Sequence, residues 1–238
     1  MIIGGYHNIA LVSEVPELPL ADLTPVAAAL QIQVQRDFFP IWNRIATVAA
    51  FDPKKIPHGF WPIRIQANIG DPNAAGFHTD ANNQPFALIA YAPDWPLTAS
   101  HECLEMILDP WGNWLTPTVR NGQSILVLRE ACDPCEDFSY QINGVTVSDF
   151  VKRGYYTAAV PLTGSYSFMG ILKHPLEVVT NGYLSWLDPA TNHWFQETYF
   201  GGVDQVVDLG PNSKEVRQGK ALREWVDEQS RKIHPKKR

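Results

Sequence analysis

His101, Glu102 and Glu105 lie together in the segment Ser100-His101-Glu102-Cys103-Leu104-Glu105, and their spacing predicts a metal site on a helix. Positions i and i+4 of an α-helix are about 40° apart around its axis and one turn apart along it, so His101 Nε2 and a Glu105 oxygen can reach one ion. Imidazole and carboxylate are both zinc ligands, and a catalytic zinc site keeps an open position for water. Glu102 flanks that position, where a carboxylate acts as the general base of metal-assisted hydrolysis.

Apolar residues around this segment predict a mostly buried helix over residues 98 to 108. Leu97, Leu104 and the run Met106-Ile107-Leu108 surround the polar side chains. Buried carboxylates and imidazoles need partners or a metal ion. The helix is expected to stop at Asp109-Pro110, because the residue before a proline avoids the α region. The alternative interpretation is a surface or hydrogen-bonded helix that binds no metal.

A metal ion needs a further protein ligand, and Glu130 is the provisional candidate for it. Glu130 follows an apolar strand expected at Ile125 to Leu128 and is close to Asp133. Asp133 would then accept a hydrogen bond from His101 Nδ1 and fix the tautomer of that ring. The alternative is that Arg129-Glu130 forms a solvated ion pair beside a turn.

Asp109, His78 and Asp80 are expected to line or support the site. Asp109 is eight residues after His101 and therefore about 12 Å further along a straight helix, which favours a supporting or turn-forming role over a ligand role. His78 and Asp80 precede a strand expected at Phe86 to Tyr91, interpreted as the edge strand that holds an extended substrate. His78 fits a ligand, a transition-state donor or a turn residue, and a site-lining role is favoured.

Composition limits the class of protein. The chain has 238 residues, of which 45% are hydrophobic and 18% charged, enough for one medium globular domain or two small ones. The formal net charge of -6 disfavours nucleic-acid binding by the body of the protein, which leaves only the basic tail at residues 231–238 for such a partner. A frayed, solvated tail is the alternative.

The chain has neither a leader-like N-terminus nor an apolar run that approaches the roughly 20 residues of a membrane span, so a cytoplasmic protein without a membrane partner is expected. Its three cysteines do not indicate a disulfide framework. Cys132 and Cys135 form a Cys-x-x-Cys pair, interpreted as two reduced cysteines in a turn, with a redox pair as the alternative.

The order of expected elements indicates an α+β fold. A helix is predicted over residues 22–39, with Thr24 as its N-cap, Pro25 at its first position and Pro40 ending or kinking it. Strands are predicted at 46–51, 61–69, 86–91 and 125–128, a turn-rich loop at 71–84, hairpins at 140–147 and 183–199, and a helix at 214–230. Residues 1–212 are expected to form one domain, followed by a C-terminal helix and basic tail at 213–238.

Several blocks of the sequence, in matching order, resemble a family of uncharacterised zincin-like bacterial and phage proteins. The blocks are Ala29 to Pro40, Gly76-Phe77-His78-Thr79-Asp80, Ser100 to Pro110, Glu130-Ala131-Cys132-Asp133-Pro134 and Gly144 to Phe150. The Ser-His-Glu-x-x-Glu-x-x-x-Asp-Pro element is also distantly similar to one in exordium-like proteins. The resemblance implies a zincin-like, metallopeptidase-like fold. In it a backing helix and a twisted, mostly antiparallel sheet support the metal-site helix, with a β-rich C-terminal half.

The resemblance brings no established substrate or reaction, and the sequence departs from zinc peptidases at one ligand. Their signature is His-Glu-x-x-His, whereas Glu105 occupies the second histidine position here. A carboxylate ligand makes the metal-bound water less acidic and favours a harder ion, so zinc is expected and calcium is the alternative. The leading hypothesis is a metal-dependent hydrolase acting on a peptide or protein substrate. The alternative is a non-catalytic binding or structural protein, associated with a phage or mobile element, that holds a structural ion or no metal.

Overall fold

The structure is a computed structural model that describes residues 4–157, 164–217 and 220–233. The chain divides into two compact units. The first unit comprises Met1–Pro110 with Ser139–Ser148, and the second comprises Trp111–Phe138 with Asp149–Arg238. This division differs from the expected boundary at residue 213, because the C-terminal helix packs inside the second unit. The tail residues 234–238 lie outside the described part of the chain.

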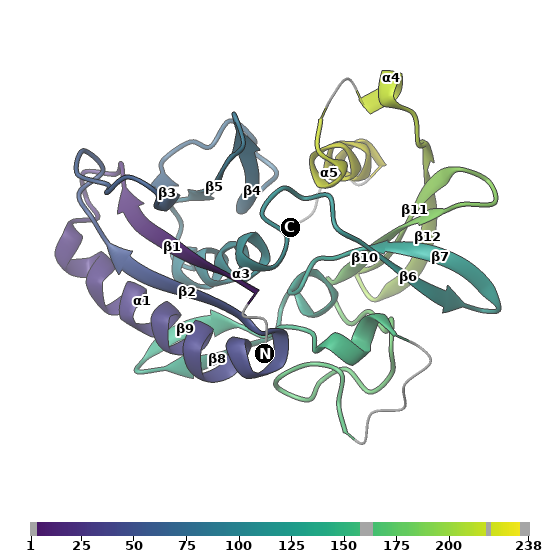
Figure 1. Cartoon of the computed structure of the whole chain (residues 1–238), viewed down its shortest axis with the longest axis horizontal. Coiled ribbons are helices and arrows are strands. Elements are labelled where there is room, and N and C mark those ends of the chain that lie inside the picture. Colours follow the sequence, from purple (N-terminus) through teal and green to yellow (C-terminus); the bar gives the residue numbers. More distant parts are fainter. Residues whose placement is uncertain (1–3, 158–163, 218–219, 234–238) are drawn as a thin grey trace. The chain divides into compact units, whose positions relative to one another are not determined.

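A five-stranded sheet forms the centre of the first unit (Figure 1). Its strands are β1 (Gly4–Ser13), β2 (Arg44–Ala50), β3 (Trp61–Gln66), β4 (Gly76–Ala81) and β5 (Gln84–Ala90), in the order β2-β1-β3-β5-β4. The pairs β1/β2, β1/β3 and β3/β5 are parallel, and only β4 is antiparallel to its neighbour. This sheet therefore differs from the mostly antiparallel one that the resemblance implied.

β4 and β5 correct two further expectations. The predicted edge strand, β5, lies inside the sheet between β3 and β4. The predicted loop over residues 71–84 contains β4, which is the edge strand. Asn82 and Asn83 have φ angles of 52° and 64°, which asparagine tolerates in the tight turns that join two antiparallel strands. The polar residues at 71–84, which predicted a loop, therefore lie largely in the β4–β5 hairpin.

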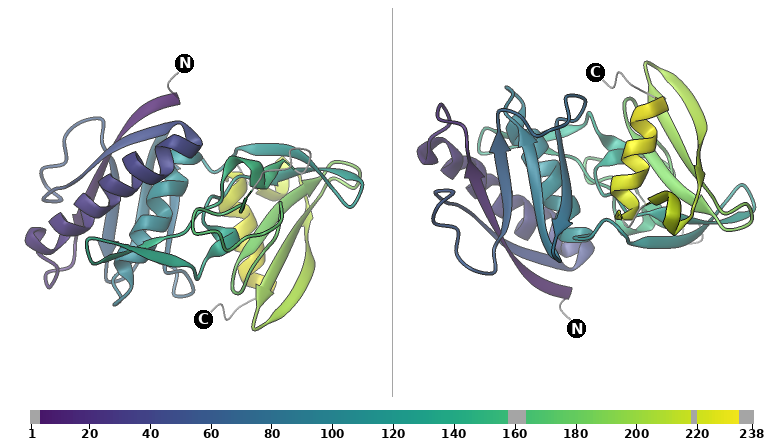
Figure 2. Two further views of the ribbon diagram at one scale, coloured as in Figure 1. Left: turned by 90° about the horizontal axis from the view of Figure 1, so that it is seen from below. Right: turned by 90° about the horizontal axis from the view of Figure 1, so that it is seen from above.

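The helices of the first unit lie along one face of this sheet (Figure 2). They are α1 (Leu20–Ile32), the π-helix η1 (Gln33–Phe38), α2 (Phe39–Trp42) and α3 (Trp95–Leu108). The first helix begins before the predicted Thr24 cap, so Pro25 lies inside α1. Pro40 does not end the helical run, because it falls in the first turn of α2, where a missing N–H is tolerated.

The hairpin of β8 (Ser139–Ile142) and β9 (Val145–Ser148) completes the first unit. It has the predicted Asn143-Gly144 turn, with φ angles of 51° and 82°. β9 packs against α3 and α1. The β8–β9 hairpin therefore belongs to the same unit as α3, although some thirty residues separate the two in the sequence.

The second unit has an antiparallel sheet in the order β12-β11-β10-β7-β6. Its strands are β6 (Leu115–Arg120), β7 (Gln123–Leu128), β10 (Tyr183–Asp188), β11 (His193–Phe200) and β12 (Val203–Pro211). The predicted hairpin at 183–199 is confirmed as β10–β11. Two short 3-10 turns, η2 (Asp133–Cys135) and η3 (Arg153–Tyr156), lie in its connections.

α5 (Leu222–Ile233) packs on this sheet through an apolar cluster (Figure 2). The cluster joins Trp225 and Val226 of α5 to Trp194, Leu187 and Leu209 of the strands. The single helix expected at 214–230 is divided into α4 (Lys214–Arg217) and α5, since Lys220 and Ala221 are not helical.

The fold class is α+β, as expected, with parallel pairing confined to the first sheet. None of the described helices combines the length and apolar character that a membrane crossing requires.

Candidate metal centre

α3 brings the three residues of the central motif together on its buried side. The residues from Ala99 to Leu108 are all buried, as the apolar pattern predicted. His101 Nε2 lies 3.3 Å from Glu105 Oε2, which is the i, i+4 contact expected on one helix face. His101, Glu102 and Glu105 each offer a possible ligand atom, and these atoms lie within 4.8 Å of one another.

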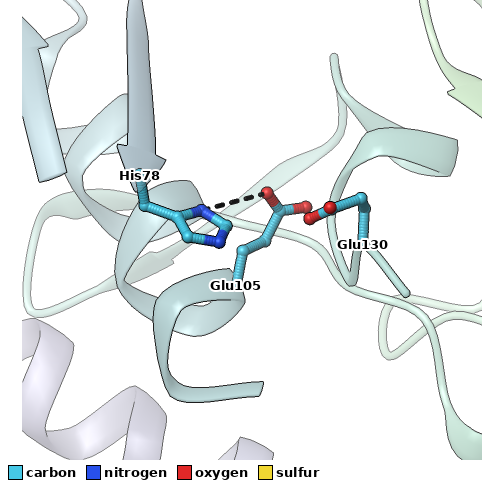
Figure 3. Close-up of side chains that lie close together, drawn as sticks. All are labelled: His78, Glu105 and Glu130. Carbon is cyan, nitrogen blue, oxygen red and sulfur yellow. Dashed lines mark ion pairs between the residues drawn. The ribbon is translucent and has the colours of Figure 1, made fainter. Parts of the chain in front are cut away.

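His78 reaches the same cluster from β4. Its Nδ1 lies 3.1 Å from Glu102 Oε2 and 4.0 Å from Glu105 Oε2. Figure 3 shows the His78 ring turned toward the Glu105 carboxylate. The side chains of His78 and Glu105 are fully buried. The four side chains therefore form one buried group of two imidazoles and two carboxylates, which we call the α3–β4 cluster.

Asp109 holds the other side of the His78 ring. Its main-chain oxygen lies 3.1 Å from His78 Nε2. Asp109 ends α3, and its N–H donates to Glu105 O over 2.7 Å. The helix C-terminus, which offers main-chain carbonyls without partners in the helix, thus supplies an acceptor for the imidazole. Asp109 thus contacts His78 through its main-chain oxygen, and its supporting role in a metal site stays a prediction.

Gly76 allows β4 to lie close to α3. A Cβ atom at this position would lie 2.7 Å from Thr98 Cγ2 and 2.9 Å from Ile89 Cδ1. A larger residue would require Thr98, Ile89 or the strand to shift, and His78 is only two residues further along β4.

A buried hydrogen-bond network fixes α3 from its other side. Ser100 Oγ donates to Gln33 Oε1 over 2.8 Å and accepts from the Ser148 N–H over 2.9 Å. Gln33 Nε2 donates to Ser148 O over 2.9 Å. This closed ring of three bonds joins η1, α3 and β9. It fixes the rotation of α3 next to His101.

Cys103 faces away from this chemistry. It is fully buried, and burial raises the pKa of its thiol to about 12. It is therefore a protonated core residue at neutral pH. Cys132 and Cys135 are also buried and form no disulfide; Cys132 precedes η2 and Cys135 ends it, in the second unit.

Asp80 is not part of the cluster. It is half-buried near the end of β4, and its Oδ2 accepts a hydrogen bond from the Asn83 N–H over 3.0 Å. Asp80 therefore fixes the β4–β5 turn, a common task for aspartate.

Glu130 and Asp133 belong to the second unit and interact there with Arg223 of α5. The Arg223 guanidinium donates to Glu130 Oε2, and its Nη2 lies 3.9 Å from Asp133 Oδ1. Its Nε lies 3.4 Å from Asp227 Oδ2. Glu130, also drawn in Figure 3, is therefore the carboxylate of a buried ion pair within its own unit.

Sequence reasoning did not single out Arg223. The residue lies on the same stripe of α5 as Val226 and Ser230, all of them buried. The signal in the sequence was the spacing of Arg223, which lies three and seven residues before Val226 and Ser230 and therefore on the same face of the helix. A guanidinium buried on such a face needs carboxylates as partners.

Comparison of the chain with protein-family models, curated proteins and solved structures gives no match.

Proposed function

We propose that the first unit is a divalent-metal-dependent hydrolase with a peptide substrate. The observation that carries the proposal is the buried α3–β4 cluster, in which His78 lies 3.1 Å from Glu102 and His101 lies 3.3 Å from Glu105. Burying two carboxylates is costly unless positive charge compensates them. A divalent cation supplies that charge, and His101 Nε2 and Glu105 Oε2 are separated as two ligands of one ion would be.

Each residue of α3 has a role in this proposal. His101 and Glu105 would hold the ion, which would supply polarisation of the substrate carbonyl and of a bound water. Glu102 accepts the proton of the attacking water and delivers it to the leaving amine. His78 fixes the Glu102 carboxylate at 3.1 Å. A carboxylate ligand at position 105 would leave a bound water less acidic than a second histidine would, so zinc is proposed with calcium as the alternative.

The peptide class of substrate is supported by the edge strand β4. Among the described residues, β4 pairs only with β5 and is therefore the edge strand on that side of the sheet. An extended peptide can pair there as an additional strand. Its main chain would then run along the strand that carries His78.

A zincin-like fold is part of the same proposal. Its support is the order of elements that follows β1 in the first unit, in which a helix, the other four sheet strands and then the ligand-bearing helix follow one another. The matching blocks of sequence around His78, His101 and Pro110 give the same indication.

The test is metal analysis of the purified full chain, followed by cleavage assays on mixed peptides with wild type and Glu102→Gln. The variant is expected to keep the metal and to lose at least about 100-fold in cleavage rate, as expected for removal of a general base. Glu17→Gln, at an exposed position of the same unit, is the matched control. Metal-free protein that cleaves nothing would contradict the proposal.

Deep burial of the cluster favours a second candidate, a non-catalytic protein with a structural ion. Glu105 is 0% exposed and Glu102 is 3% exposed, which suits an ion shielded from water. Chelator titration separates the two candidates. Loss of thermal stability without any detectable hydrolysis before chelation would favour the structural ion.

A further inference from the structure

Cys132 and Cys135 stand at the two ends of a tight turn in the second unit. The N–H of Cys135 donates to the main-chain oxygen of Cys132 over 3.0 Å, and Cys135 ends the 3-10 helix η2. Cys132 comes directly before η2 and has a helical main chain, with a φ of -110° and a ψ of -26°. Side chains three positions apart in a 3-10 helix lie one above the other. The two thiols therefore leave the turn on the same side.

The span of this turn suits a disulfide bond. A hydrogen-bonded turn of four residues keeps its first and last Cα atoms within about 7 Å of each other. Disulfides in proteins join Cα atoms that are roughly 4.4–6.8 Å apart. A bond between the sulfurs of Cys132 and Cys135 therefore requires no large displacement of the main chain.

The surroundings hold the turn in this shape. Pro134 lies within η2, and its ring fixes its own φ angle. The main-chain oxygen of Pro134 accepts a hydrogen bond from the Val179 N–H over 3.2 Å, and that of Cys135 accepts one from the Phe138 N–H over 2.9 Å. Gly182 lies close to the same Pro134 oxygen, since a Cβ atom there would be 2.5 Å from it. The folded second unit thus keeps the two cysteines arranged for a bond to each other.

A metal site does not account for the pair. A structural zinc ion takes four ligands, and two cysteines would supply only half of them. The groups of three or more possible ligands within residues 4–157, 164–217 and 220–233 contain neither Cys132 nor Cys135. The chemistry that remains for two neighbouring thiols is oxidation to a disulfide.

We infer that Cys132 and Cys135 are a dithiol–disulfide pair, which a low-molecular-weight disulfide such as oxidised glutathione converts to the linked form. One protein thiolate attacks oxidised glutathione, forms a mixed disulfide and releases one glutathione thiolate. The second protein thiolate then attacks the protein sulfur of the mixed disulfide, forms the bond between Cys132 and Cys135 and releases the second glutathione. Two protons and two electrons thus pass from the protein to one oxidised glutathione, which leaves as two reduced molecules.

Burial makes this exchange slow in both directions. Cys132 and Cys135 are both 0% exposed, so an attacking thiol or disulfide reaches them only when the turn opens locally. Once linked, the two sulfurs are shielded from reducing thiols by the same packing. The inference is independent of the proposed function, because the pair lies in the second unit and the α3–β4 cluster lies in the first.

The test equilibrates the full chain with mixtures of reduced and oxidised glutathione, once folded and once unfolded in urea. Acid quenching, alkylation and mass spectrometry of the segment that holds both cysteines then give the linked fraction. This fraction yields the effective concentration of one thiol at the other in each state. Since a link that the fold favours stabilises the fold by the same ratio, the folded value is expected to be roughly 10-fold or more above the unfolded one. A folded value equal to or below the unfolded one would overturn the inference.

Equilibrium is approached from the reduced and from the oxidised chain, so that slow access to the buried thiols does not affect the result. Cys103 is the internal control, because it lies on α3 in the first unit and is expected to be alkylated in every molecule. Cys135→Ser is expected to remove the linked form and leave at most a mixed disulfide at Cys132. In folded protein, a disulfide that includes Cys103 or joins two chains would overturn the inference. The wild-type comparison decides the matter even where the Cys135 variant does not fold.

Discussion

Asp149 is a buried carboxyl group that clamps two loops of the second unit. Its Oδ1 accepts hydrogen bonds from the N–H groups of Phe150 and Met169, over 2.8 and 2.9 Å. Burial raises its pKa above the ordinary value of 3.8, and the main-chain donors and Lys152 only partly oppose this. Ionisation of Asp149 therefore costs stability in the folded chain.

Asp149→Asn is expected to stabilise the protein at neutral pH. A raised folded-state pKa means that the stabilising contribution of Asp149 is fully present below pH 3.8 and is lost as the pH rises through the folded-state value. Asparagine keeps the Oδ1 acceptor and does not ionise. Its thermal midpoint should exceed that of wild type by a few degrees at pH 7, at roughly 2–4 °C per kcal/mol. Thermal scans from pH 7 to pH 4 should show the gap closing, and a gap that widens toward pH 4 would contradict this account.

Residue-level prediction from the sequence worked where the contact is local. The His101–Glu105 pair follows from helix periodicity alone, since both residues lie on one helix four positions apart. The Arg223–Glu130 pair spans 93 positions and depends on how α5 docks on its sheet. No pattern around Glu130 contains that information. The ligand role of Glu130 stays a prediction. In the structure its carboxylate accepts a hydrogen bond from Arg223.

Close approach of β4 to α3 is the element-level feature on which the cluster depends. Gly76→Ala would place a methyl group 2.7 Å from Thr98 Cγ2 and 2.9 Å from Ile89 Cδ1, so these side chains or the strand must shift. We expect a loss of about 1–3 kcal/mol in the free energy of unfolding, together with weaker zinc binding although every ligand is retained. Chemical denaturation and zinc titration measure the two effects.

Gly182→Ala is the matched control for this substitution. Its Cβ would lie 2.5 Å from Pro134 O, so it crowds main-chain atoms of the second unit. It should destabilise the protein but leave zinc affinity unchanged. If Gly76→Ala and Gly182→Ala lost the same zinc affinity, the loss would come from lower overall stability. It would not come from displacement of β4 relative to α3.

Ser100→Ala is expected to loosen the β8–β9 hairpin. The substitution removes the partner of Gln33 Oε1 and of the Ser148 N–H, both of them buried. Each buried group left without a bond costs about 1–3 kcal/mol, so a loss of about 2 kcal/mol or more is expected. Amide hydrogen exchange at Ser148 should accelerate. Ser124→Ala, at an exposed position of β7, should change stability by less than about 0.5 kcal/mol.

Elements with strong local signals were predicted well, whereas the order of strands was not. The Asn143-Gly144 turn fixes its hairpin because both residues adopt positive φ. β4 was missed because Asn82 and Asn83 read as loop residues, although they form an equivalent turn. Parallel pairing of β1 with β2 and β3 joins distant segments, and no local pattern specifies it.

At the scale of the whole molecule, metal removal is expected to affect the two units differently. The α3–β4 cluster lies entirely in the first unit, and the apolar cluster under α5 lies entirely in the second. A ligand stabilises the structure that binds it, so a chelator should accelerate amide exchange in α3 and β4 and spare β10 and β11. Hydrogen exchange with mass spectrometry measures this. A uniform acceleration over both units would argue that they unfold as one.

The interleaved path of the chain sets an order of events during synthesis. The ribosome completes the main segment of the first unit at Pro110, but the hairpin that closes the unit ends at Ser148, 38 residues later. At roughly 5–20 residues per second, this leaves a delay of roughly 2–8 s before that last piece is made. During this interval the surfaces of α1 and α3 that β9 will cover stay open to solvent. The nascent chain therefore passes through a stage at which these exposed surfaces can associate with other chains. A chaperone would protect them until the hairpin is made.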